Sequence, residues 1–224
     1  MATANALQLE PVTLEDIPAV VDVWFAAFAE SGVRHLFPNT PGVRQWWADA
    51  NRDDLMHKSF QKYVKVVDTE SIDEHGRPRL IAYAKWDLSM IPDRGRRFPP
   101  WHEEQPAGEC EAFFGGMDQV RLRVMGEQKH YCRKPTPRLR LSRRDTDIDR
   151  HRITDLDMLG THPDFRKRGA ASMLVRWGCE LADREGVGAY VDASKAGAPL
   201  YMKFGFVDHS SPDSTTGIAA MARK

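Results

Sequence analysis

The run from Leu156 to Ala171 joins an apolar strand pattern, a short loop with three consecutive cations and the start of a helix. A helix that begins near Gly169 presents backbone N–H groups without intrahelical partners and a partial positive charge. Glycine at this point allows close approach of a phosphate, and Arg166, Lys167 and Arg168 add positive charge. The run contains neither G-x-x-x-x-G-K-[ST] nor G-x-G-x-x-G after its strand. The sequence therefore predicts a diphosphate site of another kind at the start of this helix.

Three ordered blocks carry a resemblance to a known family. The first, Arg166-x-x-Gly169-x-Ala171, resembles the (Q/R)-x-x-G-x-(G/A) motif with which GNAT (Gcn5-related N-acetyltransferase) enzymes hold the pyrophosphate of acetyl-coenzyme A. Upstream, residues 156–163 resemble the family's fourth strand, and downstream, residues 193–206 resemble its fifth strand, following helix and closing Gly-Phe element. The chain thus resembles the GNAT superfamily over most of its length, and small fungal-type members in particular.

The resemblance implies an α/β fold. Its central sheet is mixed and mostly antiparallel, helices flank it, and the fourth and fifth strands splay apart. The pantetheine arm of acetyl-coenzyme A is expected between these strands, on the backbone of Leu159, Gly160 and Thr161. Gly160 is expected to mark a β-bulge, because glycine inside a strand often does so. The diphosphate is expected on Arg166, Lys167, Arg168, Gly169, Ala170, Ala171 and Ser172.

Acetyl transfer to an amine needs a group that takes a proton from the amine and one that protonates the departing thiolate. The resemblance places Tyr201 as the acid, and a phenol stays protonated at neutral pH. Asp155 aligns with a catalytic glutamate of some family members, and Asp157 lies two residues on, so both are candidate bases. A core tyrosine and ion-paired strand aspartates are the alternative interpretations, as is a water acting through a backbone carbonyl.

Two further sets of residues are candidates for ligand contact. Ser194 either hydrogen-bonds the pantetheine, as polar residues at that family position do, or caps the helix that starts near Gly197. The tryptophans Trp24, Trp46 and Trp101 are candidate walls of a pocket for an apolar or aromatic amine.

Hydrophobic periodicity predicts the elements that position these residues. Strands are expected over 7–12, 63–67, 80–86, 153–161, 187–193 and 218–222, and helices over 13–28, 41–60, 109–126, 169–185 and 198–204. The polar run 51–54 interrupts the second helix pattern. The alternation from residue 153 onward is typical of parallel strands joined by helices.

We expect a single domain over residues 1–224, with a lid or insertion at 92–152. Residues 92–106 carry the Pro99-Pro100-Trp101 run and are expected to form a loop. Residues 132–152 hold seven arginines and little that could pack, so we expect a mobile segment. A passive insertion, a gene-model artefact and a nucleic-acid arm remain open as its explanation.

Composition sets the remaining expectations. The 32 basic and 32 acidic residues balance, and no apolar run approaches the length of a membrane span, so neither nucleic acid nor membrane is an expected partner. The N-terminus lacks a signal-peptide pattern, and the cytoplasm is the expected location. Cys110, Cys132 and Cys179 form no C-x-x-C pair, so we expect no metal site. The oligomeric state is expected to be a monomer or homodimer.

The function that these observations predict is transfer of acetyl from acetyl-coenzyme A to a primary amine, by direct attack within a ternary complex. The acceptor is expected to be a small molecule, with an N-terminal amine or lysine of a protein as the alternative. A coenzyme A-binding sensor or scaffold without catalysis is the competing class, and the presence of Tyr201 speaks against it.

Overall fold

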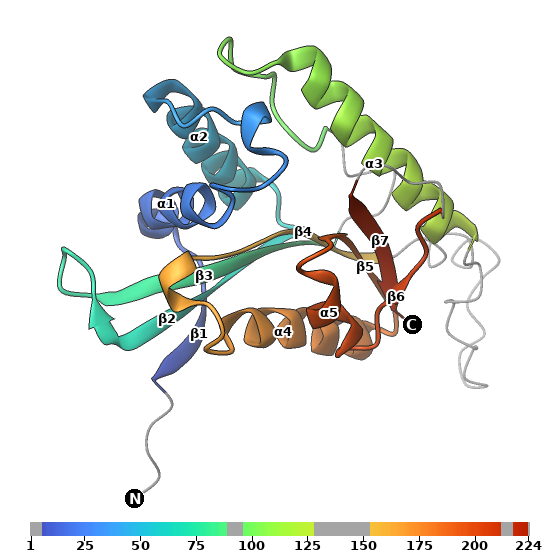
Figure 1. Cartoon of the computed structure of the whole chain (residues 1–224). Coiled ribbons are helices and arrows are strands. Elements are labelled where there is room, and N and C mark those ends of the chain that lie inside the picture. The colour runs from blue at the N-terminus through green and yellow to red at the C-terminus, as the bar shows by residue number, and fades with distance from the viewer. Residues whose placement is uncertain (1–5, 89–95, 128–152, 212–216, 224) are drawn as a thin grey trace, which may run out of the picture.

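The computed structural model describes residues 6–88, 96–127, 153–211 and 217–223. These residues form one twisted seven-stranded sheet in the order β1-β2-β3-β4-β5-β7-β6, with helices on both faces. In Figure 1, α1, α2 and α3 lie on one face of the sheet, and α4 and α5 lie on the other. The expected α/β architecture with a mixed, mostly antiparallel sheet is confirmed.

The strands follow the predicted order along the chain. They are β1 (Leu7–Pro11), β2 (Gln61–Ile72), β3 (Pro78–Asp87), β4 (Ile153–Thr161), β5 (Gly188–Ser194), β6 (Val207–Asp208) and β7 (Ile218–Arg223). Only β4 and β5 pair in parallel, and β7 pairs antiparallel with β5. The expectation of parallel strands throughout the C-terminal half is therefore wrong, because the chain returns to β7 through β6 as a hairpin rather than through a helix.

The helices are α1 (Ile17–Ala27), α2 (Pro41–His57), α3 (Ala107–Glu127), α4 (Ala170–Glu185) and α5 (Ala198–Met202). Thr40 caps α2 by accepting the N–H of Val43, and Pro41 takes the first helical position. Helix α2 runs unbroken through the polar 51–54 run, because Asn51 and Asp54 are buried against the sheet. No helix of the described ranges combines the length and apolar character of a membrane span.

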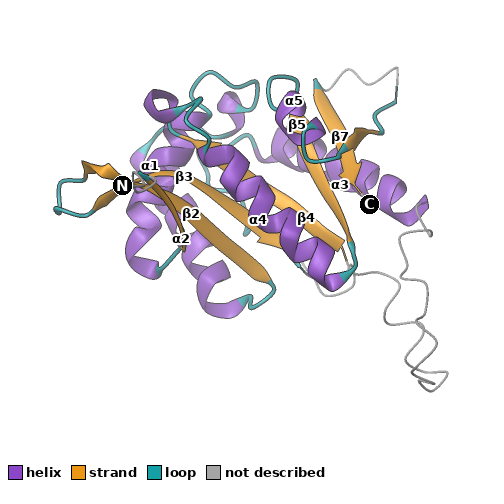
Figure 2. Cartoon of the chain, turned by 90° about the horizontal axis from the view of Figure 1, so that it is seen from below, coloured by secondary structure: helices purple, strands orange, loops and turns teal. Residues whose placement is uncertain are grey.

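Each face of the sheet has its own core. The α4 face is built around Trp86, Leu174 and Val175, and the α1/α2 face around Trp24, Phe37 and Trp47. Figure 2 shows α4 lying across the α4 face of the sheet. Helix α4 comes so close to the sheet that a Cβ on Gly178 would lie 2.1 Å from the Trp86 ring. This contact fixes the depth of α4, and the long helix in turn fixes the loop that leads into it.

The fourth and fifth strands separate part-way along their length. Their parallel pairing extends only from Ile153 opposite Gly188 to Leu156 opposite Val191. Beyond that point β4 stays paired with β3, and among the described residues no strand pairs with its other edge. The expected splay is confirmed, and it opens towards the start of α4.

Candidate active site

The entrance of α4 has the backbone conformation expected for an anion site. Gly169, at the N-cap, has φ +97°, and Lys167 has φ +63°, so two residues of the loop are left-handed. The first amide of the helix to bond a backbone carbonyl is that of Met173, whose N–H donates to Gly169 at 3.1 Å. A Cβ on Gly169 would meet no atom within 4 Å. The amides of the first turn therefore face open space.

The three cations of this loop have different positions. Arg166 donates from Nη2 to the carbonyl of Ala27 at the end of α1 (2.9 Å). Arg168 pairs through Nη1 with Asp68 of β2 at 2.6 Å, and this hydrogen bond raises the pKa of Arg168 and lowers that of Asp68. Lys167 is exposed and forms no ion pair within the described ranges. Two of the predicted anion contacts thus anchor the loop, while Lys167 is available to a ligand.

The remaining predicted diphosphate contacts lie in the first turn of α4. Ala170 is buried, whereas Ala171 and Ser172 are partly exposed. The apolar side chain of Ala170 packs into the core of the α4 face. The first turn therefore presents its backbone N–H groups, rather than its side chains, to a ligand. The structure brings Gly169, Ala170, Ala171 and Ser172 together in the arrangement that the sequence predicts.

The exposed edge of β4 leads away from this entrance. Leu159, Gly160 and Thr161 pair regularly with Ala84, Tyr83 and Ala82 on the β3 side. Thr161 Oγ1 is buried and has no hydrogen-bond partner among the described residues. An unpaired strand edge with an unsatisfied buried hydroxyl is a suitable binding surface for an amide-containing arm.

The β-bulge in β4 is not at Gly160. The register between β3 and β4 shifts between Lys85 and Trp86, which pair with Met158 and Leu156, so Asp157 is the extra residue. The prediction for Gly160 is wrong because its close neighbour is α1: a Cβ there would lie 3.5 Å from the Ala27 side chain. The bulge directs both Asp157 and Met158 to the α1/α2 face, where Trp24 donates to the Met158 sulfur at 3.3 Å.

Tyr201 and Ser194 lie together at the end of β5. Ser194 Oγ accepts the N–H of Gly197 at 3.1 Å and so closes the turn before α5; Gly197 is the N-cap of α5 and no side chain caps this helix, so the capping prediction is wrong. The Tyr201 ring lies 3.5 Å from where a Cβ on Gly197 would be, and 5.8 Å from the Phe206 ring centre. Tyr201 is 7% exposed, and burial raises its pKa. A phenol in this setting stays protonated at any pH near neutrality.

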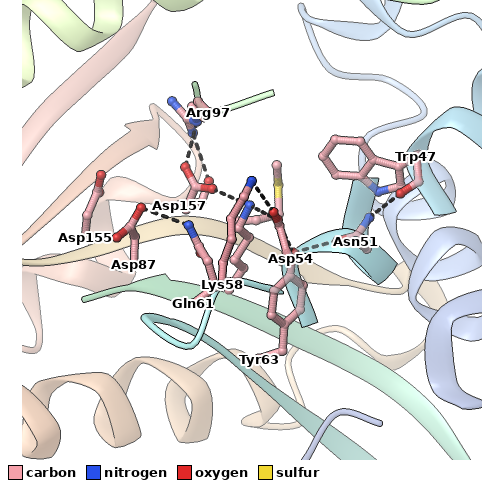
Figure 3. Close-up of polar contacts among 12 residues, drawn as sticks. Trp47, Asn51, Asp54, Lys58, Gln61, Tyr63, Asp87, Arg97, Asp155 and Asp157 are labelled. Atoms are coloured by element: carbon pink, nitrogen blue, oxygen red, sulfur yellow. Dashed lines mark hydrogen bonds and ion pairs between the residues drawn. The ribbon is translucent and has the colours of Figure 1, made fainter. Parts of the chain in front are cut away.

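Asp157 belongs to a buried ionic network between α2, β3 and the loop before α3 (Figure 3). Its Oδ1 lies 2.6 Å from Arg97 Nε, and its Oδ2 lies 3.0 Å from Lys85 Nζ. Lys85 also contacts Asp54 of α2 at 2.5 Å, and Asp54 accepts from Tyr63 Oη at 2.8 Å. Burial alone would lower the pKa of Lys85, but Asp157 and Asp54 together raise it. The two carboxylates therefore keep the Lys85 ammonium charged despite its burial.

Asp155 lies two residues earlier on the same face and is also buried. Its Oδ2 lies 3.4 Å from Arg121 of α3, which in turn pairs with Asp118 at 3.3 Å. Asp157 therefore lies at the strand opening and Asp155 within the last paired residues before it, and both have cationic partners.

A cavity of about 570 Å³ lies between α2 and the loop before α3. Its apolar wall includes Trp46, Trp47 and Phe98, and its polar wall includes Asp54, Lys85 and Arg97. Of the predicted pocket tryptophans only Trp46 lines it. Trp24 is 1% exposed and packs in the core, and Trp101 stacks behind Trp46 with ring centres 5.6 Å apart.

Several residues of this site were not predicted from the sequence. They are Asp54, Lys85 and Arg97 of the ionic network, Trp47 of the cavity, and Asp192 of β5. The polar run within the amphipathic pattern of α2 is a signal that indicates buried polar contacts there. Lys85 and Asp192 each stand inside an apolar strand run, and no spacing pattern links them to a partner.

Comparison with known proteins identifies this arrangement. The model of the acetyltransferase (GNAT) family matches residues 138–206, which include β4, α4, β5 and α5. The sequence matches no protein of curated function. The α4 entrance, the splayed strands and this match define a class, the acyltransferases that use coenzyme A thioesters. The match to the GNAT family covers residues 138–206, and the described fold is the GNAT fold.

Solved structures with the same fold cover nearly the whole chain. One is "histone acetyltransferase HPA2 and related acetyltransferase" from Corynebacterium glutamicum, at 20% identity, TM-score 0.53 and 97% and 96% coverage of the two chains. Another is arylalkylamine N-acetyltransferase 2 from Aedes aegypti, at 12% identity, TM-score 0.53 and 98% and 99% coverage. A third is PaiA N-acetyltransferase from Thermoplasma acidophilum in complex with coenzyme A, at 8% identity, TM-score 0.50 and 97% and 98% coverage. At these identities the likeness shows the fold.

Proposed function

We propose that this protein transfers the acetyl group of acetyl-coenzyme A to a primary amine of a small molecule. The observation that carries the proposal is the alignment of two open features: the amide-rich start of α4 at Gly169 and the edge of β4 from Met158 to Thr161, with which no described strand pairs. A diphosphate suits the first and an amide-containing arm suits the second. Acetyl-coenzyme A carries both groups and supplies the acetyl group as a thioester.

The cavity beside α2 supports a small acceptor. A volume of about 570 Å³ lies within the range of small-molecule sites, and its Trp46, Trp47 and Phe98 wall suits an apolar or aromatic body. Three aspartates and four cations line it, so the charges of the lining nearly balance and the apolar wall is the feature that selects the acceptor. The names of the solved GNAT structures indicate different acceptors, so the fold does not identify the acceptor. The proposal for the acceptor is therefore based on the cavity.

Direct attack within a ternary complex is favoured by the state of the cysteines. Cys110 and Cys179 are 0% and 5% exposed, and burial raises the pKa of both thiols. A buried neutral thiol is a poor nucleophile, so neither supports a covalent acyl-enzyme. We assign Tyr201, in the short helix α5 that follows β5, the role of protonating the departing sulfur.

A thiol-release assay with acetyl-coenzyme A tests the proposal. The amines are tyramine, 2-phenylethylamine, tryptamine, spermidine and glucosamine, and a lysine-containing peptide represents the protein acceptors. We expect turnover with an arylalkylamine and none with the peptide. Turnover with the peptide alone would favour a protein acetyltransferase, and calorimetric uptake of acetyl-coenzyme A without turnover would favour a sensor.

A pair of α2 variants tests the acceptor cavity. Ala50→Phe fills the cavity that Ala50 lines, so the KM for the amine should rise at least tenfold while acetyl-coenzyme A affinity stays the same. Gln45→Phe introduces the same side chain on the exposed surface of the same helix and serves as the control. Equal KM values in the two variants would remove the cavity from the proposal.

A further inference from the structure

Asp192 of β5 lies where β4 and β5 separate. The last parallel pair joins Leu156 to Val191, so Asp157 and Asp192 are the next residues on the two strands. Asp192 pairs through its backbone with Ala220 of β7 on its other side. Its side chain therefore stands at the mouth of the opening in which the proposed function places the thioester.

The side chain of Asp192 is on the α3 face of the sheet. It shares this face with Tyr190, because the two residues are two positions apart on a strand. Tyr190 is fully buried with Val124 and Ala220, and its hydroxyl donates to Asp192 Oδ1 at 2.8 Å. Asp192 itself is only partly buried, and in the described ranges its Oδ2 forms no hydrogen bond or ion pair. One oxygen is thus positioned by tyrosine while the other is available.

The other two carboxylates at the opening are less suited to accept a proton. Asp157 contacts Arg97 and Lys85 with its two oxygens, so both oxygens already have cationic partners. Asp155 has Arg121 as its partner. Asp192 faces Asp155 from β4, Arg121 from α3 and Arg97 from the loop, none of which is bonded to it.

The charges around Asp192 favour a carboxyl that titrates near neutrality. Burial raises the pKa of Asp192 to about 6, and the charge of Asp155 adds to the rise against the opposing effects of Tyr190, Arg97 and Arg121. A group that is mostly ionised at pH 7 and holds a proton below pH 6 suits reversible proton transfer.

We propose that Asp192 is the general base of the acetyl transfer, a role that rests on the proposed function. Its free oxygen takes one proton from the acceptor ammonium and later releases it to solvent. The neutral amine nitrogen then forms a bond to the acetyl carbon while the carbon–sulfur bond breaks. Tyr201 gives its proton to the sulfur and recovers one from the acylated nitrogen, so the products are the amide, the coenzyme A thiol and one proton.

The pH dependence of kcat/KM tests this assignment, with the most active arylalkylamine of tyramine, 2-phenylethylamine and tryptamine. In wild type, kcat/KM should fall as the pH drops through about 6, and we call this fall the acid limb. Above it, kcat/KM should be constant. Asp192→Asn should lower kcat/KM at least about 100-fold and abolish the limb, and Asp192→Glu should restore part of the activity. Asn still accepts the Tyr190 hydroxyl, so Asp192→Asn should fold and should not melt below the wild-type temperature.

Two neighbouring substitutions should move the limb in opposite directions. Asp155→Asn removes a negative charge and should shift it to lower pH, whereas Tyr190→Phe removes a hydrogen bond that favours the carboxylate and should shift it to higher pH. Carbon-13 NMR of the aspartate carboxyls provides a readout that needs no substrate. A carboxyl titrating near pH 6 should be present in wild type and absent from Asp192→Asn.

Three results separate the possible failures. An Asp192→Asn variant with at least half of the wild-type kcat/KM and an unchanged limb would overturn the assignment and leave the acetyltransferase proposal intact. The assignment would also be overturned if no aspartate of the wild-type protein titrates near pH 6. It would be overturned equally if neither Asp155→Asn nor Tyr190→Phe shifts the acid limb. Absence of acetyl-coenzyme A uptake by wild type in calorimetry would instead refute the proposed function, and the assignment with it.

Discussion

Lys85 is the residue on which the buried ionic network depends. It is 7% exposed, and its ammonium contacts Asp54 at 2.5 Å and Asp157 at 3.0 Å. Lys85→Met keeps the length of the side chain and removes the charge. Two buried carboxylates then lose a shared cation, while Asp54 keeps Lys58 at 2.6 Å and Asp157 keeps Arg97 at 2.6 Å. Because each carboxylate keeps one cation, the cost is at most that of a fully broken buried pair, about 3–5 kcal/mol. For a chain of this size each kcal/mol lowers the melting temperature by about 2–4 °C, so the expected loss is at most about 20 °C.

The pH dependence of this loss gives a sharper test than its size. Removal of the Lys85 charge favours the protonated forms of the two buried carboxylates relative to wild type, even though Lys58 and Arg97 remain beside them. A carboxyl with a raised folded-state pKa destabilises the protein when it is ionised and not when it is protonated. The deficit of Lys85→Met should therefore be smaller at pH 5 than at pH 7.

Thermal unfolding followed by circular dichroism at both pH values measures the deficit. Lys62→Met, on an exposed position of the neighbouring strand β2, is the matched control and should change stability by no more than about 0.5 kcal/mol. A melting temperature for Lys85→Met within 2 °C of the control, or an equal deficit at pH 5 and pH 7, would refute the reasoning.

Three further predictions concern the site. Tyr201→Phe should lower kcat more than tenfold with little change in acetyl-coenzyme A affinity by calorimetry, and unchanged turnover would remove the acid role. Gly169→Ala places a side chain at φ +97°, which costs about 1–2 kcal/mol of stability, and should weaken acetyl-coenzyme A binding about tenfold; an unchanged Kd would argue against a diphosphate at this helix start. Asp192→Asn should raise the melting temperature at pH 7 but not at pH 4, and a lower melting temperature at pH 7 would contradict the raised pKa.

Local patterns in the sequence were enough to predict most of the elements. Strand β4 has the predicted bounds, and α4 starts one residue after the predicted Gly169, because apolar periodicity and the glycine specify them locally. The sequence pattern also led to the α4 entrance, since the cations and the glycine are contiguous. The direction of β7 was mispredicted, because alternation of strands and helices does not encode a two-residue strand such as β6.

The ionic network could not be predicted in the same way. Asp54, Lys85, Arg97 and Asp157 come from α2, β3, a loop and β4, and only their packing brings them together. Each alone looks like a solvated charge, and the polar run of α2 was an argument against the helix rather than a sign of burial. The bulge at Asp157 likewise follows from pairing with β3, which is not encoded in the spacing of β4 alone.

Asp157 and Asp192 have different effects on the stability of the fold, and this difference is evidence about their function. Asp157 lies between two cations, so a negative charge on it is compensated within the fold. Asp192 is ionised at pH 7 although burial and Asp155 raise its pKa to about 6, so its charge opposes folding. A shift of about two units corresponds to at most about 3 kcal/mol at neutral pH, present as a penalty above pH 6 and absent below pH 4. The Asp192 carboxylate at the strand opening lowers the stability of the fold when it is ionised. A role in proton transfer explains its presence there better than a role in packing.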